Sequence, residues 1–107
     1  MKRLVFGNAK LSFNDAWTQG FYPASVEGLS YGIVQAAGGP CGVLASVQAW
    51  LLRHLLYGEG RSRGRDCSRA VFEEALCNGL ADMLWQAGGA RRACIAVAAG
   101  IAISPSC

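Results

Sequence analysis

Apolar residues recur at helical spacing in the middle of the chain. The stretch 42–57 has them at intervals of three and four, a pattern typical of an α-helix that buries one stripe. Further apolar residues occupy its other faces, so the pattern predicts a central, buried helix over 42–57, ending at Gly58. The first set is Leu44, Val47, Leu51 and Leu55, and the second is Val43, Trp50, Leu52 and Leu56.

A second helix is predicted over 68–87. Ser68 has the side chain preferred at a helix N-cap, and Gly88-Gly89 would end the helix. Large apolar residues recur at every fourth position along it, namely Phe72, Leu76, Leu80 and Leu84. The apolar run 93–99 is short and bounded by glycine, which favours a buried strand. Two helices followed by a strand indicate an α+β class.

Composition narrows the class of protein further. The chain has 107 residues, 52% hydrophobic and 16% charged, which favours a single folded domain and argues against disorder. Surplus apolar surface would suit a fragment whose missing part normally covers it. The net charge of +3 comes largely from the stretch 61–65, which we interpret as a solvated loop. A nucleic-acid partner would need a larger basic face.

Membrane insertion, metal binding and secretion are not expected either. The apolar run 93–103 is far shorter than the ~20 residues of a spanning helix. The five cysteines contain no C-x-x-C pair, so no zinc site is predicted, and no cofactor is implied. The odd cysteine count and the lack of an N-terminal apolar signal segment predict reduced thiols in a cytoplasmic or nuclear protein.

The candidate chemistry lies where a glycine-rich turn meets the first helix. Cys41 follows Gly38-Gly39-Pro40 at this junction. The first N–H groups of a helix have no intrahelical acceptor and carry a partial positive charge. A thiolate is stabilised there, so the pKa of the cysteine falls and a nucleophile forms near neutral pH. Cys41 is therefore the candidate nucleophile.

Gln35 is the candidate partner of this thiol. Its side-chain amide could donate a hydrogen bond to the oxyanion that forms when a thiolate attacks a carbonyl, and the backbone N–H of Cys41 could be a second donor. One such donor is worth about 3 kcal/mol of transition-state stabilisation. A lone cysteine at a helix start is more often a small buried residue. The combination of the glutamine with a Pro-Cys pair at a turn before a helix favours a catalytic role for Cys41 over a structural one.

The segment 35–48 resembles the active-site segment of the MINDY family of deubiquitinases, in the branch of its third and fourth members. The similarity extends over roughly residues 3–103. The residues that carry it are Gln35, Gly38-Gly39-Pro40-Cys41-Gly42-Val43-Leu44-Ala45 and Val47-Gln48, with Phe13-Asn14, Trp17 and Tyr31-Gly32-Ile33-Val34 before them and Leu80, Asp82, Leu84-Trp85 and Ala87-Gly88 after them.

The resemblance implies an α+β, papain-like cysteine-protease fold. It also implies an enzyme that hydrolyses isopeptide bonds in polyubiquitin, with a preference for lysine-48 linkages. Cys41 matches the family's nucleophile and Gln35 its oxyanion-hole residue. The family's third catalytic residue, a histidine, lies downstream of the second helix. Residues 1–107 are accordingly expected to form an incomplete, nucleophile-bearing part of the catalytic domain, inactive alone, with ubiquitin or polyubiquitin as partner.

The single histidine, His54, is not expected to replace that base. It follows Cys41 by 13 residues on the same predicted helix. At ~1.5 Å per residue this separates the two by about 20 Å, whereas a base must lie within about 3 Å of its nucleophile. Two other functions stay open. One is a non-catalytic ubiquitin-binding pseudo-deubiquitinase. The other is nucleotide binding at the glycine-rich turn, which lacks the expected phosphate-binding spacing.

Overall fold

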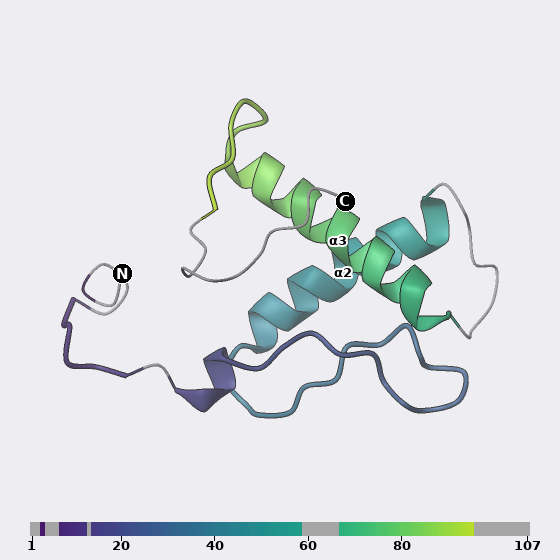
Figure 1. Cartoon of the computed structure of the whole chain (residues 1–107), viewed down its shortest axis with the longest axis horizontal. Helices are drawn as coiled ribbons and strands as arrows, with labels where there is room; N and C mark the ends of the chain where they lie inside the picture. Colours follow the sequence, from purple (N-terminus) through teal and green to yellow (C-terminus); the bar gives the residue numbers. More distant parts are fainter. Residues whose placement is uncertain (1–2, 4–6, 13, 59–66, 96–107) are drawn as a thin grey trace.

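Two helices that cross one another dominate the computed structural model, which describes residues 3, 7–12, 14–58 and 67–95. A short 3-10 helix, η1 (Asp15–Trp17), is followed by α2 (Cys41–Tyr57) and α3 (Arg69–Ala87). Figure 1 shows the segment between η1 and α2 running alongside α2 and passing the start of α3, where Ser30 hydrogen-bonds with Cys67. The segment before α2 can therefore supply side chains to the start of that helix.

The segment before α2 folds back on itself through a few backbone hydrogen bonds. Pro23 and Ile33 form an isolated antiparallel bridge. Ala24 N–H donates to the Gly32 carbonyl at 2.7 Å, and Val34 N–H donates to the Tyr22 carbonyl at 2.9 Å. These contacts bring the chain to Gln35 beside the first turn of α2.

The α+β expectation is met only in its helical part. Within the described ranges, the backbone pairs only at that bridge and forms no strand. Residues 93–95 of the predicted strand are not in a strand, and residues 96–99 lie outside the described residues, as does the basic stretch 61–65. The papain-like sheet is thus not seen here.

Helix α2 starts one residue before the predicted range and ends where predicted. Gly58 caps it, and its N–H donates to the His54 carbonyl at 2.9 Å. The helix buries one stripe, which consists of Leu44, Val47, Leu51 and Leu55. The prediction of a central, buried helix holds only for this stripe, because Val43 is 46% exposed and Leu56 is 59% exposed on its other faces. Among the described residues, α3 and the segment around residues 31–33 cover the buried stripe of this helix, while Leu56 lies on an exposed face.

Helix α3 also follows the predicted range closely. The Ser68 hydroxyl accepts a hydrogen bond from Val71 N–H at 3.4 Å, which confirms the predicted N-cap. Its buried stripe nevertheless differs from the predicted one, because Phe72, Ala75 and Gly79 are buried while Leu84 is 38% exposed. Gly79 explains the difference. A Cβ atom there would lie 3.2 Å from the Trp50 carbonyl carbon, so the two helices cross where α3 has no side chain.

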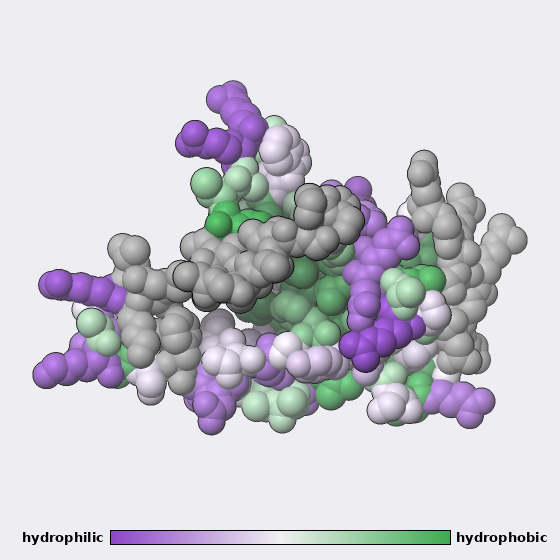
Figure 2. All heavy atoms as spheres, viewed as in Figure 1, coloured by the Kyte–Doolittle hydropathy of each residue, from purple (hydrophilic) through white to green (hydrophobic). Residues whose placement is uncertain are grey.

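The hydrophobic core lies between the two helices. Leu51 and Phe72 are 0% and 1% exposed, and Leu55 and Ala75 complete the buried cluster. Figure 2 shows apolar side chains gathered in the middle of this face and polar ones toward its periphery. Full burial of a Leu or Phe side chain contributes roughly 1.5–3 kcal/mol, so this small cluster provides much of the stability. Partly buried side chains packed against it are Tyr31, Ile33, Cys67, Val71 and Leu76.

The described cysteines differ in oxidation state. Cys41, Cys67 and Cys94 carry free thiols. Cys77 is disulfide-bonded, so the expectation of reduced thiols is wrong at that position. Among the described residues, neither helix is long and apolar enough to cross a membrane.

Candidate active site

Cys41 is the first residue of α2, and its side chain is exposed. Pro40, which occupies the N-cap, is buried and makes no side-chain hydrogen bond to the helix. The N–H groups of the first turn are therefore not capped by a side chain at this position, and the positive end of the helix dipole acts on the sulfur. A thiol here is both accessible to a substrate and electrostatically favoured as a thiolate.

Gln35 lies next to this sulfur. Its Nε2 atom is 3.3 Å from Cys41 Sγ and 3.2 Å from the Ala37 carbonyl oxygen, so the amide donates to both. The pKa of the Cys41 thiol lies below its ordinary value, chiefly because of the Gln35 hydrogen bond, with backbone N–H donation from Gly39 as the next cause. The structure thus brings together the two residues that the sequence singled out. It also shows how a donor to the sulfur favours the charged, nucleophilic form.

Gly39 gives the turn before Cys41 its shape. Its φ is +136°, a conformation that residues with a side chain rarely adopt, and a Cβ atom there would lie 3.4 Å from Ala16 Cβ. Gly38 differs, because a Cβ atom at that position would meet nothing within 4 Å. Of the two glycines, Gly39 is the one whose backbone conformation favours a residue without a side chain.

Two glutamines that sequence reasoning did not single out hold the backbone before α2, Gln19 at the turn beside the site and Gln48 farther back. Gln19 accepts a hydrogen bond from Ala36 N–H at 2.9 Å and donates to the Ala37 carbonyl at 3.2 Å. Gln48, on α2, accepts from Ile33 N–H at 2.6 Å and donates to the Tyr31 carbonyl at 3.0 Å. The resemblance includes Gln48, but only the folded structure reveals what either side chain contacts.

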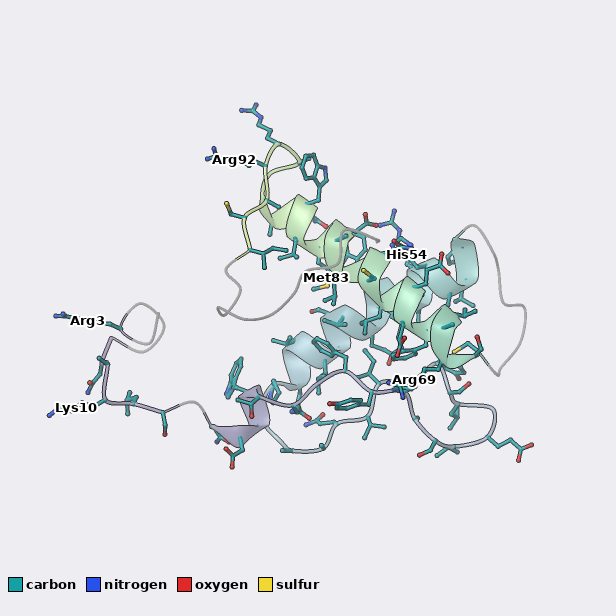
Figure 3. The ribbon with its side chains drawn as sticks, viewed as in Figure 1. Arg3, Lys10, His54, Arg69, Met83 and Arg92 are labelled. Carbon is teal, nitrogen blue, oxygen red and sulfur yellow. The ribbon has the colours of Figure 1, made fainter. Side chains whose placement is uncertain are left out.

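His54 lies apart from this cluster, as the helical spacing predicts. Its Nε2 atom is 3.0 Å from Asp82 Oδ2 on α3, and its side chain is 23% exposed. Figure 3 shows His54 toward the end of α2 that is remote from η1. Arg53 also approaches the Asp82 carboxylate, at 3.5 Å, and stacks over Trp50. His54 therefore belongs to a contact between the two helices.

An exposed thiol at a helix start, with a lowered pKa and an amide donor beside it, is the arrangement that cysteine hydrolases use to attack acyl carbonyls. Comparison with known proteins agrees with this class. The family described as "Deubiquitinating enzyme MINDY-3/4, conserved domain" matches residues 2–106. The chain therefore belongs to the MINDY-3/4 deubiquitinase conserved-domain family.

Individual relatives are similar over most of this chain but only a small part of their own length. The chain is 43% identical over 105 residues to the "Probable ubiquitin carboxyl-terminal hydrolase MINDY-4" of Homo sapiens, covering 92% of this chain and 14% of that protein. It is 46% identical over 93 residues to the "Ubiquitin carboxyl-terminal hydrolase MINDY-3" of Bos taurus, covering 82% of this chain and 20% of that protein. No solved structure matches the chain.

Proposed function

We propose that this chain is the nucleophile-bearing part of a cysteine-type deubiquitinase with a papain-like catalytic domain. The observation that carries the proposal is the 3.3 Å approach of Gln35 Nε2 to Cys41 Sγ at the start of α2. Family membership supports it, since the MINDY-3 and MINDY-4 relatives are named ubiquitin carboxyl-terminal hydrolases. Ubiquitin or polyubiquitin, joined through lysine 48 as the family resemblance implies, is the proposed substrate.

Each of the two residues has a separate role in the proposed reaction. The Cys41 thiolate attacks the carbonyl carbon of the isopeptide bond, and the carbonyl oxygen becomes an oxyanion. Gln35 Nε2 and the Cys41 N–H donate hydrogen bonds to that oxygen, a contribution of about 3 kcal/mol for each donor. The intermediate then expels the lysine amine, which takes up a proton, and leaves a thioester on Cys41. Water hydrolyses the thioester and releases the ubiquitin carboxylate.

The proton transfers need a base, and among the described residues no histidine lies at Cys41. The chain's one histidine is His54, which contacts Asp82 and lies about 20 Å along α2 from the nucleophile. We therefore propose that the chain by itself turns over ubiquitin conjugates very slowly or not at all, while its thiol stays reactive. We also propose a cytoplasmic or nuclear location, where the Cys41 thiol would stay reduced, although the disulfide at Cys77 does not support that location.

A ubiquitin probe with a C-terminal vinyl electrophile tests the proposal. Addition of a thiolate to the vinyl group needs no leaving-group protonation, so the probe reports on recognition and on the nucleophile together. We expect a covalent adduct on the Cys41 peptide, none with Cys41→Ala, and an unchanged yield with Cys94→Ala, which removes a second exposed thiol. Absence of an adduct from the folded chain would contradict the proposal.

A non-catalytic ubiquitin-binding role is the second candidate. The observation that favours it is the engagement of the chain's one histidine with Asp82, away from the thiol. Binding without chemistry predicts that Cys41→Ala keeps the affinity for polyubiquitin and that the unmodified chain shows neither hydrolysis nor probe capture. Loss of affinity in step with loss of the thiol would reject it.

A further inference from the structure

We propose that Gln19 is a positioning residue for the candidate active site, which fixes the backbone of residues 36–37 so that Gln35 aims its amide at Cys41. The inference rests on the proposed function, because it assigns Gln19 a purpose in the same site. It concerns a side chain that neither the sequence pattern nor the family comparison assigns.

The Gln19 side chain uses both ends of its amide on backbone groups. Its Oε1 atom accepts from Ala36 N–H at 2.9 Å and from Ala37 N–H at 3.4 Å. Its Nε2 atom donates to the Ala37 carbonyl at 3.2 Å and to the Ala16 carbonyl at 2.7 Å. One half-buried side chain thus holds two consecutive residues of the turn, including both backbone polar groups of Ala37.

The Ala37 carbonyl links the hydrogen bonds of Gln19 to those of Gln35, which contacts the nucleophile. It accepts from Gln19 Nε2 and also from Gln35 Nε2, each at 3.2 Å. Gln35 has two N–H donors, of which one meets this carbonyl and the other meets the Cys41 sulfur at 3.3 Å. If the carbonyl moves, the anchored side of the Gln35 amide moves with it, and the donor that meets the sulfur loses its direction.

The Gln19 side chain also contacts η1. Ala16, whose carbonyl accepts from Gln19, is 3% exposed and belongs to η1. Asn14 caps η1 by accepting from Ala16 N–H at 3.0 Å, and Gly39 of the turn lies close to the same residue, since a Cβ atom on Gly39 would be 3.4 Å from Ala16 Cβ. Gln19 therefore connects η1 to the segment between Gln35 and Cys41, where no regular secondary structure holds the backbone.

The test measures the rate of Cys41 alkylation by iodoacetamide as a function of pH, followed on the Cys41 peptide by mass spectrometry. Gln19→Met keeps the length and packing of the side chain and removes all four hydrogen bonds. We expect its rate profile to move to higher pH by the same amount as in Gln35→Ala. The double variant is expected to move no further, because both changes disable one donor.

Gln48→Met is the matched control. It removes two hydrogen bonds that hold Ile33 and Tyr31, outside the turn, and should lower the melting temperature without moving the profile. If Gln19→Met leaves the profile in place while Gln35→Ala shifts it, Gln19 does not position the donor. An equal shift in Gln48→Met would also overturn the inference, because general loosening of the segment would then suffice.

The outcome is separable from that of the proposed function, since alkylation needs no ubiquitin. A shift in Gln19→Met together with no capture by the ubiquitin probe supports the positioning role and rejects only the deubiquitinase proposal. Should Gln19→Met fail to fold, as judged by circular dichroism, the same comparison uses Gln19→Asn, which keeps an amide too short to reach both Ala16 and Ala37.

Discussion

The imidazole Nε2 of His54 lies 3.0 Å from the Asp82 carboxylate, so the chain's one histidine connects α2 to α3. Its contact is with a residue 28 positions along the chain and on the other helix. This assigns the histidine to the packing of the helices, and it separates the stability of the fold from the reactivity of the thiol.

His54→Gln should therefore leave the chemistry of Cys41 unchanged. We expect the same alkylation profile and the same yield of ubiquitin-probe adduct as in the unmodified chain, with a loss of about 1 kcal/mol or less in unfolding free energy for this partly exposed pair. Urea denaturation measures the stability and peptide mapping measures the adduct. A loss of thiol reactivity in a folded His54→Gln protein would show that the histidine acts on Cys41 after all.

Removing the Gln35 amide should raise the pKa of the Cys41 thiol. The amide donates to the sulfur and so favours the thiolate, and it is the largest cause of the lowered pKa. In Gln35→Ala the midpoint of the alkylation profile is expected to move upward, toward the ordinary cysteine value. Reactivity near pH 7 should fall while the plateau at high pH is retained.

The lowered pKa of the Cys41 thiol also makes the stability of the chain depend on pH. A thiol whose folded-state pKa is lowered stabilises the folded chain fully above its unfolded-state pKa, and the effect is lost as pH falls through the folded-state value. The unmodified chain should therefore gain stability relative to Cys41→Ala as pH rises from the folded-state pKa of Cys41 to its unfolded-state pKa. An unchanged difference across the interval would contradict the lowered pKa.

The two helical glycines should respond in opposite directions to alanine. At Gly79 a Cβ atom would lie 3.2 Å from the Trp50 carbonyl carbon and 3.3 Å from Leu51 N, so α2 would have to move away. We expect Gly79→Ala to lower the unfolding free energy by about 1–3 kcal/mol, as overpacking does. Thermal unfolding followed by circular dichroism measures the change.

Gly42 provides the matched comparison. A Cβ atom there would meet nothing within 4 Å, and alanine favours the helix over glycine by up to about 1 kcal/mol. Gly42→Ala should therefore stabilise the chain slightly. A stabilising Gly79→Ala would mean that the helices do not cross as closely as described.

Truncation of the core should cost far more than truncation of the exposed face of α2. Leu51 is 0% exposed and Leu56 is 59% exposed on the same helix. Leu51→Ala is expected to cost about 2–5 kcal/mol, and Leu56→Ala within about 0.5 kcal/mol. Equal losses in urea denaturation would show that the exposed face of α2 is covered in solution.

The local parts of the fold were predictable because their causes are local. Ser68 caps α3 and Gly58 caps α2 through groups within four residues of the helix ends, and such contacts can be read from spacing alone. The buried stripe of α3 was not predictable in the same way. Four leucine and phenylalanine positions suggested one face, but the absence of a side chain at Gly79 selected another, because helices approach most closely where nothing separates their backbones.

The candidate site, too, could be predicted only in part. The sequence by itself determined that Cys41 follows a glycine-rich turn at a helix start, that Gln35 precedes it, and that His54 is too far along the helix to serve as its base. Only the tertiary structure decided that Gln35 aims at the sulfur, that Gln19 holds the backbone of residues 36–37 beside it, and that Gln48 holds Tyr31 and Ile33 farther back. The hydrogen bonds of Gln19 to the turn and of Gln48 to Tyr31 and Ile33 join residues 15 to 18 positions apart, and their geometry depends on how the chain folds back, which no local pattern encodes.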